Sequence, residues 1–577
     1  MAIEDDSGTG ASAFHSNPIL NSPYEAPGRH WILDEGRQPT ERIGDGRREV
    51  SFVSPIPRPR KAGRAPQTEM AYDAAGRRLA TGGEQYDLTA LIDGLRRELA
   101  EWRALPESHW RVTPETARLL KHWRHHAFSG IRPFFCQLEA VETVIWLTEV
   151  APAIGGRGRR YLEQIQTSSD NANPGLSRMA LKLATGAGKT AVMAMLIAWQ
   201  TVNAVRRPGS LRFTRGFLVV TPGITIRDRL RVLKPNDPDS YYASRELVPP
   251  DMLREIDKAK IVITNYHAFQ LRETMDLAKG SRALLQGRDG ELATRETEGQ
   301  MLARVMPELM TMKGILVLND EAHHCYREKA GEDDEGRLVG DDRREANRNR
   351  EAARVWISGL EATQRRLGLK RVIDLSATPF FLRGSGYAEG TLFPWTVSDF
   401  SLMDAIECGI VKLPRVPVVD NVPGAEMPMF RNLWDHVGKR MPKRGRGAGT
   451  TLDPMALPSE LQTALEALYG HYEKTYRLWE EAGIDVPPCF IVVCNNTATS
   501  KLVYDYIAGF RRDSGSGAAT FQNGRLELFR NFDDAGEPLP KPRTLLIDSQ
   551  QLESGEALDR SSHSGFAALT RREPVIT

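Results

Sequence analysis

The sequence predicts an α/β protein with a parallel central sheet that helices cover on both faces. The prediction depends on short apolar runs that are rich in β-branched residues and separated by helical stretches. These runs lie at 217–220, 261–263, 315–318 and 372–375. Each run is followed by polar residues, and ligands of such a sheet bind beyond the carboxyl ends of its strands. We therefore expect the functional residues to follow the strands.

Length and composition are those of a globular protein with several domains. The chain has 577 residues and a net charge of only +2, so any contact with nucleic acid must be local. Its five cysteines lack the spacing of metal ligands and favour reduced thiols in a cytoplasmic protein over disulfides. No uninterrupted apolar run reaches the length needed to cross a bilayer, so no membrane partner is expected.

The amino-terminal part divides into an arm and a helical region. Residues 1–85 are rich in Pro, Gly, Ser and Arg and show little apolar periodicity, which predicts an extended or partly disordered arm. Residues 86–130 show helical periodicity, and Thr113 followed by Pro is a typical helix start. On that helix His122 and His126 have the spacing of metal ligands. A solvated helix end is favoured, because no carboxylate or cysteine lies near them in the sequence.

Residues 183–190, Leu-Ala-Thr-Gly-Ala-Gly-Lys-Thr, predict a phosphate-binding loop. Its glycines let the backbone turn sharply, so that successive N–H groups and the start of the next helix can face phosphates. Lys189 would then reach the β- and γ-phosphates, and Thr190 would hold Mg²⁺. The other residues predicted to contact the nucleotide are Thr185, Gly186, Ala187 and Gly188. Ala184 stands where the usual pattern has its first glycine.

Gln137 lies upstream of this loop, after an aromatic stretch, and is a candidate for binding the base of the nucleotide. Its amide can form hydrogen bonds with both edges of an adenine, while Arg132 or Phe134 can stack on the ring. This prediction depends on the loop being a nucleotide site.

Two adjacent carboxylates, Asp320 and Glu321, follow the run 315–318. Buried carboxylates at a strand end are costly unless a cation or a proton needs them. Asp320 can hold the Mg²⁺ that bridges the β- and γ-phosphates, and Glu321 can orient and deprotonate the attacking water. The alternative is an acidic turn that caps the next helix, and the phosphate loop upstream argues against it.

A second polar turn, Ser376-Ala377-Thr378-Pro379, follows the run 372–375. Small hydroxyl residues before proline form a rigid turn. Ser376 and Thr378 can thereby sense whether His323 and the γ-phosphate are in place. The alternative is a plain turn without a coupling role.

The two remaining runs also end in groups that suit the phosphate oxygens of a nucleic-acid strand. These groups are Thr221, Arg227, Thr264 and Asn265. Each is a weak indication alone, and their order along the chain strengthens them.

The motif series resembles that of superfamily 2 helicases, and more closely that of the Res subunit of type III restriction enzymes. The stretches that carry the resemblance are 184–190, the Asp320-Glu321-Ala322-His323 (DEAH) box, 376–379, 393–400 and 543–549. It covers most of the chain, from about Asn17 to about Asp559.

The resemblance implies an ATP-dependent DNA helicase or translocase with two RecA-like lobes, normally followed by a nuclease domain. It implies ATP and Mg²⁺ as cofactors, and double-stranded DNA and a methyltransferase (modification) subunit as partners. An RNA helicase or a repair helicase of the same superfamily is the alternative, because motif order alone does not separate them.

On the basis of this resemblance, three regions follow the helical region 86–130. They are a complete RecA-like ATP-binding lobe at 131–395, a linker or insert at 396–455 and a partial second lobe at 456–577. In the partial lobe, apolar runs at 490–494 and 544–547 predict strands. A long helix from Ser459 is expected to turn Leu465 and Leu468 inward.

Two motifs of the resembling family do not occur in this sequence. A two-lobe ATPase needs an arginine to neutralise the transferring phosphoryl group, and the family's Gln-x-x-Gly-Arg-x-x-Arg stretch is missing. The Asp/Glu-x-Lys triplet of restriction nucleases is missing as well. We therefore expect a truncated second lobe and no nuclease chemistry. A shortened product that binds nucleotide or a partner without turnover stays open as an alternative.

Overall fold

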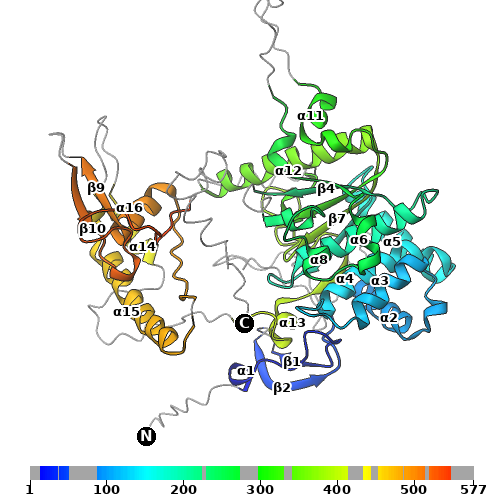
Figure 1. Cartoon of the computed structure of the whole chain (residues 1–577), viewed down its shortest axis with the longest axis horizontal. Helices are drawn as coiled ribbons and strands as arrows, with labels where there is room; N and C mark the ends of the chain where they lie inside the picture. The colour runs from blue at the N-terminus through cyan, green and yellow to red at the C-terminus, as the bar shows by residue number, and fades with distance from the viewer. Residues whose placement is uncertain are drawn as a thin grey trace, which may run out of the picture. The chain divides into compact units, whose positions relative to one another are not determined.

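The computed structural model describes most of the chain in two compact units, a first unit (1–413) and a second unit (414–577). The described residues are 13–34, 36, 38–50, 88–223, 229–272, 296–329, 341–413, 433–442, 453–484, 486–513 and 519–547. The elements of both units are labelled in Figure 1.

The first unit is built on a six-stranded parallel sheet with the strand order β5-β4-β6-β7-β3-β8. Its strands are β3 (Arg178–Leu183), β4 (Gly216–Thr221), β5 (Lys260–Asn265), β6 (Ile315–Asp320), β7 (Leu369–Ser376) and β8 (Thr396–Phe400). The four apolar runs therefore form the expected strands, and the predicted α/β fold class is confirmed. Strand β8 belongs to the same sheet although it lies beyond residue 395, where the sequence analysis ends the first lobe.

Both faces of the sheet are buried, which explains why the residues of its strands are largely apolar. Along β4, Phe217 and Val219 lie in one apolar cluster, and Leu218 and Val220 lie in another. Successive side chains of a strand point to opposite faces, so the two clusters are the two covered faces. Figure 1 shows α12 (Asp341–Leu367) on one side of the sheet and α4 (Phe135–Ile145) and α6 (Lys189–Arg206) on the other.

The helices begin and end largely as their sequences predict. Thr113 Oγ accepts a hydrogen bond from Thr116 N at 3.1 Å, which confirms it as the N-cap of α3. The other helices of the first unit are α2 (Leu88–Ala104), α3 (Pro114–His125), α5 (Gly156–Ala172), α8 (Tyr241–Ser244), α9 (Leu253–Ile256), α11 (Glu298–Val305) and α13 (Leu402–Glu407). A π-helical turn (Trp146–Val150) continues α4. None of the described helices combines the length and the apolar character needed to cross a bilayer.

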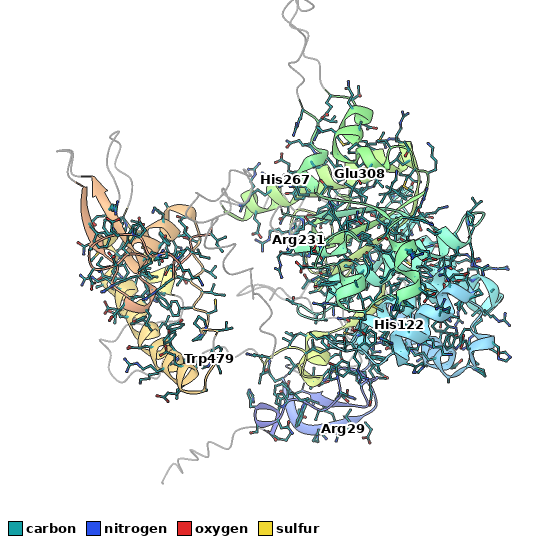
Figure 2. All side chains as sticks on the ribbon, viewed as in Figure 1. Arg29, His122, Arg231, His267, Glu308 and Trp479 are labelled. Carbon is teal, nitrogen blue, oxygen red and sulfur yellow. The ribbon has the colours of Figure 1, made fainter. Side chains whose placement is uncertain are left out.

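The histidine pair of α3 meets a carboxylate that the sequence places far away. His122 (Figure 2) and His126 stack with ring centroids 4.3 Å apart. His122 Nε2 lies 2.7 Å from the Glu246 carbonyl oxygen, and His126 Nε2 lies 2.9 Å from Glu246 Oε2. The two rings therefore hold the chain at Glu246 against the end of α3, and no cluster of three metal-ligating side chains occurs among the described residues.

Residues 13–50 form a small folded element within the region predicted as an arm. It consists of α1 (Ala13–Ser16) and an antiparallel hairpin of β1 (Arg29–Leu33) and β2 (Pro39–Asp45). Trp31 is buried, and its backbone N–H donates to Glu407 Oε1 at 3.0 Å. Arg47 pairs with Glu139 at 2.6 Å. The partners that order this segment come from the sheet-bearing part, so local sequence does not reveal them.

Among its described residues, the second unit contains helices and one antiparallel hairpin. Its elements are α14 (Leu433–Val437), α15 (Ser459–Glu481), α16 (Thr497–Ala508), β9 (Gly509–Asp513) and β10 (Ala519–Asn523). The strands predicted at 490–494 and 544–547 are wrong, because neither segment pairs with another strand among the described residues. A strand needs a neighbour to satisfy its backbone groups. On α15, Leu465 is buried as expected, whereas Leu468 is 51% exposed.

Candidate functional site

The loop between β3 and α6 has the backbone geometry of a phosphate-binding loop. Gly186 and Gly188 adopt φ of +86° and +84°, a left-handed conformation that strains other residues. A Cβ on Gly188 would also collide with Gln137 Nε2. Helix α6 starts directly afterwards at Lys189, so its amino end faces the loop. Such an end is suited to an anion because of its free N–H groups and dipole.

Gln137 holds this loop against the start of α4. Its Nε2 donates to the Ala187 carbonyl oxygen at 2.9 Å, and its Oε1 accepts from Phe134 N at 3.1 Å. The side chain is buried, and both ends of its amide are engaged within the protein. Binding of adenine by Gln137 therefore stays a prediction, while its contact with the phosphate loop is a structural fact.

Arg132, Phe134 and Phe135, which lie two to five residues before Gln137, form a cluster with Tyr24. Sequence reasoning missed Tyr24. The Arg132 guanidinium lies 4.0 Å from the ring centroid of Tyr24. The rings of Tyr24 and Phe134 are 5.7 Å apart. Phe135 N donates to the Pro23 carbonyl oxygen at 2.8 Å, so residues 23–24 lie against the start of α4. Only the folded chain brings them there.

Asp320 and Glu321 lie at the carboxyl end of β6, as predicted. Burial and, to a smaller extent, the charge of Glu321 raise the pKa of Asp320 to about 6. Asp320 Oδ1 is buried without a hydrogen-bond partner in the part of the chain that the structure describes. A buried oxygen of this kind fits a cation, since Mg²⁺ prefers carboxylate and hydroxyl oxygens. Thr190, half-buried on the first turn of α6, is the predicted second ligand.

The phosphate loop and β6 are joined by one ion pair. Lys189 Nζ lies 2.6 Å from Glu321 Oε1. Glu321 adopts a φ of +48°, which is unusual for a residue with a side chain. The predicted phosphate-binding lysine and the predicted base therefore contact each other directly.

The three predicted coupling residues are in contact. His323 Nδ1 lies 2.9 Å from Ser376 Oγ, which also accepts a hydrogen bond from Thr378 N at 3.1 Å. Burial and, to a smaller extent, the charges of His324 and Lys189 lower the pKa of His323 to about 3. His323 is therefore neutral near pH 7, and β6 and β7 are linked at their carboxyl ends.

The residues predicted to contact DNA lie at the carboxyl ends of β4 and β5. Thr221 and Asn265 are partners in the strand register. Thr221 Oγ donates to the Gly223 carbonyl oxygen at 2.8 Å, and Thr264 Oγ donates to the Asn265 carbonyl oxygen at 3.3 Å. Asn265 Oδ1 accepts from Ala268 N and caps the short helix η6 (Tyr266–Phe269). Arg227 lies outside the described residues.

A buried polar network supports the strands that carry the site. Arg178 Nε lies 2.8 Å from Asp374 Oδ2, and Asp374 Oδ1 accepts from Asn319 Nδ2 at 2.8 Å. Trp395 Nε1 donates to Asp374 at 2.7 Å. Sequence reasoning missed this network, although a charged residue inside an otherwise apolar run, such as Asp374, is a signal that could have found it.

The first unit is an α/β domain in which the loop at 184–190 and the polar strand ends after β6 and β7 follow one another in the predicted order. Residues 131–381 match the family model described as "Type III restriction enzyme, res subunit". The predicted resemblance to this subunit and to superfamily 2 helicases is thereby confirmed over that segment.

Among curated proteins no sequence matches the chain. The crystal structure of T4 UvsW is 13% identical, covers 54% of this chain and has a TM-score of 0.21. The chain spans 44% of the length of that structure.

Proposed function

We propose that the first unit binds Mg-ATP at residues 184–190 and is the motor part of a restriction-type DNA helicase or translocase. The observation that carries the proposal is the convergence of Lys189, Glu321 and the unpartnered Asp320 Oδ1 at the carboxyl ends of β3 and β6. Each group has the charge that its role requires.

Lys189 would bind the β- and γ-phosphates, and this requires the Lys189–Glu321 pair to open. A phosphate that takes Glu321's place on Lys189 frees the Glu321 carboxylate to orient and deprotonate water. Asp320 and Thr190 would hold Mg²⁺, which would offset the charge of the phosphates. Gln137 would bind adenine after its amide leaves Ala187 or Phe134.

His323, Ser376 and Thr378 would transmit the state of the site to the loops after β4 and β5. Because His323 is neutral near pH 7, its contact with Ser376 does not depend on protonation in that range. Thr221, Arg227, Thr264 and Asn265 would contact the phosphates of double-stranded DNA. A methyltransferase subunit as partner and a cytoplasmic location belong to the same proposal.

Replacing Lys189 with Ala tests the nucleotide site. We expect loss of ATP binding, because the phosphates lose their cation, measured by titration with a fluorescent ATP analogue. Lys121→Ala is the control, since Lys121 is exposed and pairs only with Glu107 at 3.6 Å. Equal affinity of the Lys189 variant and the wild type would contradict the proposal.

Measuring steady-state ATP hydrolysis distinguishes a motor from the alternative, a shortened product that binds nucleotide or a partner without turnover. DNA-stimulated ATP hydrolysis by the chain supports a motor, whereas ATP binding without hydrolysis supports the alternative. Stimulation by RNA and not by DNA would favour the RNA helicase of the same superfamily.

A further inference from the structure

The amino ends of the strands form a basic edge on the first unit, at the end of the sheet away from the phosphate loop. Its members are Arg212, Arg215, Lys258, Lys260, Lys313, Arg366 and Lys370. All are exposed except Lys370, which is half-buried. The six-residue strands β4, β5 and β6 separate this basic edge from the carboxyl ends by about 20 Å.

Hydrogen bonds and close contacts make these residues neighbours across the four strands β5, β4, β6 and β7. Lys370 Nζ donates to the Leu211 carbonyl oxygen, and a Cβ on Gly314 would lie 2.7 Å from Lys370 Cε. Lys313 Nζ donates to the Arg366 carbonyl oxygen at 3.2 Å. Lys260 N donates to the Arg215 carbonyl oxygen at 2.8 Å, which joins β5 to β4.

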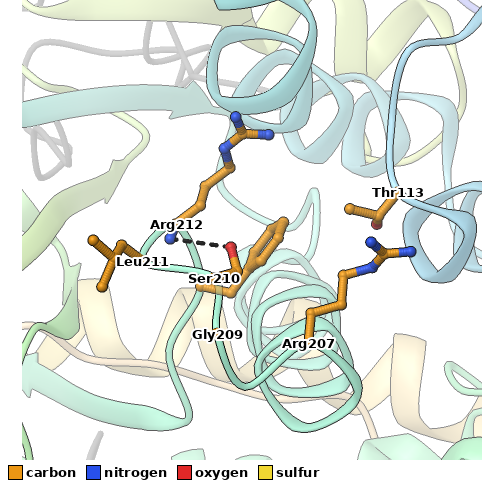
Figure 3. Close-up of a pocket in the computed structure, with 7 residues that line it drawn as sticks. Thr113, Arg207, Gly209, Ser210, Leu211 and Arg212 are labelled. Atoms are coloured by element: carbon orange, nitrogen blue, oxygen red, sulfur yellow. Dashed lines mark hydrogen bonds between the residues drawn. The ribbon is translucent and has the colours of Figure 1, made fainter.

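The pocket drawn in Figure 3 extends the basic edge beside β4. Arg207, Leu211 and Arg212 line it. Leu211 is 86% exposed, so its side chain adds apolar surface next to the cations. Arg207 is paired with Glu115 at 2.7 Å, whereas Arg212 makes no ion pair with a described residue.

The basic edge carries more positive than negative charge, although Arg212 lies close enough to the buried Glu149 for its charge to lower the pKa of that carboxyl. None of its seven members pairs with a carboxylate among the described residues, although the flanking cations Arg206 and Arg365 do, with Glu255 and Glu298. Two acidic residues lie next to members of the basic edge in the sequence. Asp257 directly precedes Lys258, and Glu308, labelled in Figure 2, lies five residues before Lys313. Like charges held close together repel, so an anionic ligand relieves an unfavourable interaction.

We propose that the basic edge binds the phosphate backbone of a nucleic-acid duplex. Neighbouring strands lie about 4.8 Å apart, so the row from β5 to β7 spans roughly 14 Å. A nucleic-acid strand carries one phosphate per about 3.4 Å of helix axis, so a duplex presents several phosphates over this length. The choice of nucleic acid as ligand rests on the proposed function, and the surface is separate from the loops assigned to DNA there.

The salt dependence of binding tests this inference. In the full chain without nucleotide, we compare duplex DNA binding of the wild type and of K260Q/K313Q/K370Q over a series of salt concentrations. The slope of log K against log salt is negative, and each lost phosphate contact reduces its magnitude by about 0.9. We therefore expect the variant to have a slope shallower by about 3 and weaker binding. An unchanged slope overturns the inference, as does a wild type that binds polyglutamate and no DNA.

Two controls separate the possible failures. K121Q/K474Q/K501Q removes three exposed lysines elsewhere and should leave the slope unchanged. ATP-analogue binding by K260Q/K313Q/K370Q should equal that of the wild type, which shows that the first unit is folded. Lys189→Ala should lose ATP binding and keep the salt slope, so failure of the nucleotide site is distinguishable from failure of the basic edge.

Discussion

Similar apolar sequences adopt different structures in the two units. In the first unit the run 217–220 is β4, fully buried between β5 and β6. In the second unit the run 490–494 is equally rich in β-branched residues, yet Ile491 is 77% and Val493 is 90% exposed. A strand pattern thus predicts a strand only where neighbouring strands exist to pair with it. The second unit's described hairpin, β9 and β10, does not reach this run.

The largest expected difference between the units lies in their ion pairs. Asp374→Ala leaves the Arg178 guanidinium, which is 0% exposed, without its partner. We expect the free energy of unfolding of the first unit to fall by about 3–5 kcal/mol. Urea unfolding followed by tryptophan fluorescence measures the change, because Trp356 and Trp395 lie beside the network.

The matched change in the second unit is Lys501→Ala. Lys501 pairs with Asp505 at 2.7 Å one turn along α16, and the two side chains are 59% and 13% exposed. An ion pair at this helical spacing contributes about 0.3–0.5 kcal/mol. Equal losses in the two variants would show that burial does not distinguish the pairs.

Side-chain truncation gives the next largest effect. Leu218→Ala removes a fully buried side chain from β4, and we expect a loss of about 2–5 kcal/mol in the free energy of unfolding. Ile491→Ala should change it by no more than about 0.5 kcal/mol, since that side chain is exposed. Denaturant titration of both variants checks this. A large loss for Ile491→Ala would mean that the run 490–494 is buried in solution.

A smaller effect than those of Asp374→Ala and Leu218→Ala is predicted for Asp320, a carboxylate of the first unit whose burial destabilises its charged form. The pKa of Asp320 is raised from 3.8 to about 6, so the folded state binds more protons than the unfolded state between these values. The contribution of Asp320 to the free energy of unfolding of the first unit therefore falls as pH rises from about 4 to about 6. Asp320→Asn should stabilise the first unit by about 1–3 kcal/mol at pH 7 without Mg²⁺.

The pH dependence is the control for this prediction. Below pH 4 the two forms should be equally stable, because Asp320 is then protonated in both states. Thermal unfolding at low and neutral pH measures the difference. A stabilisation that is the same at every pH would assign the effect to something other than the charge of Asp320. Loss of Mg-ATP binding in the same variant would support its proposed role.

Most of the site follows from local sequence. The glycines of 186–188, the start of α6 at Lys189 and the adjacent carboxylates Asp320 and Glu321 lie where the motifs predict. The reason is physical: each is set by a turn or by a strand end, and these are properties of a few consecutive residues. The Lys189–Glu321 pair could not be predicted, because it depends on how two loops meet in the folded protein.

The sequence alone determined the α/β class, the strands of the first unit and the order of its polar strand ends, because apolar periodicity and turn chemistry are local. Only the tertiary structure decided that residues 13–50 fold against α4 and α13, that Arg178 and Asp374 share a buried network, and that 490–494 stays unpaired. Each of these depends on partners that are distant in the sequence, and a hydrogen bond or an ion pair forms only when both partners are present.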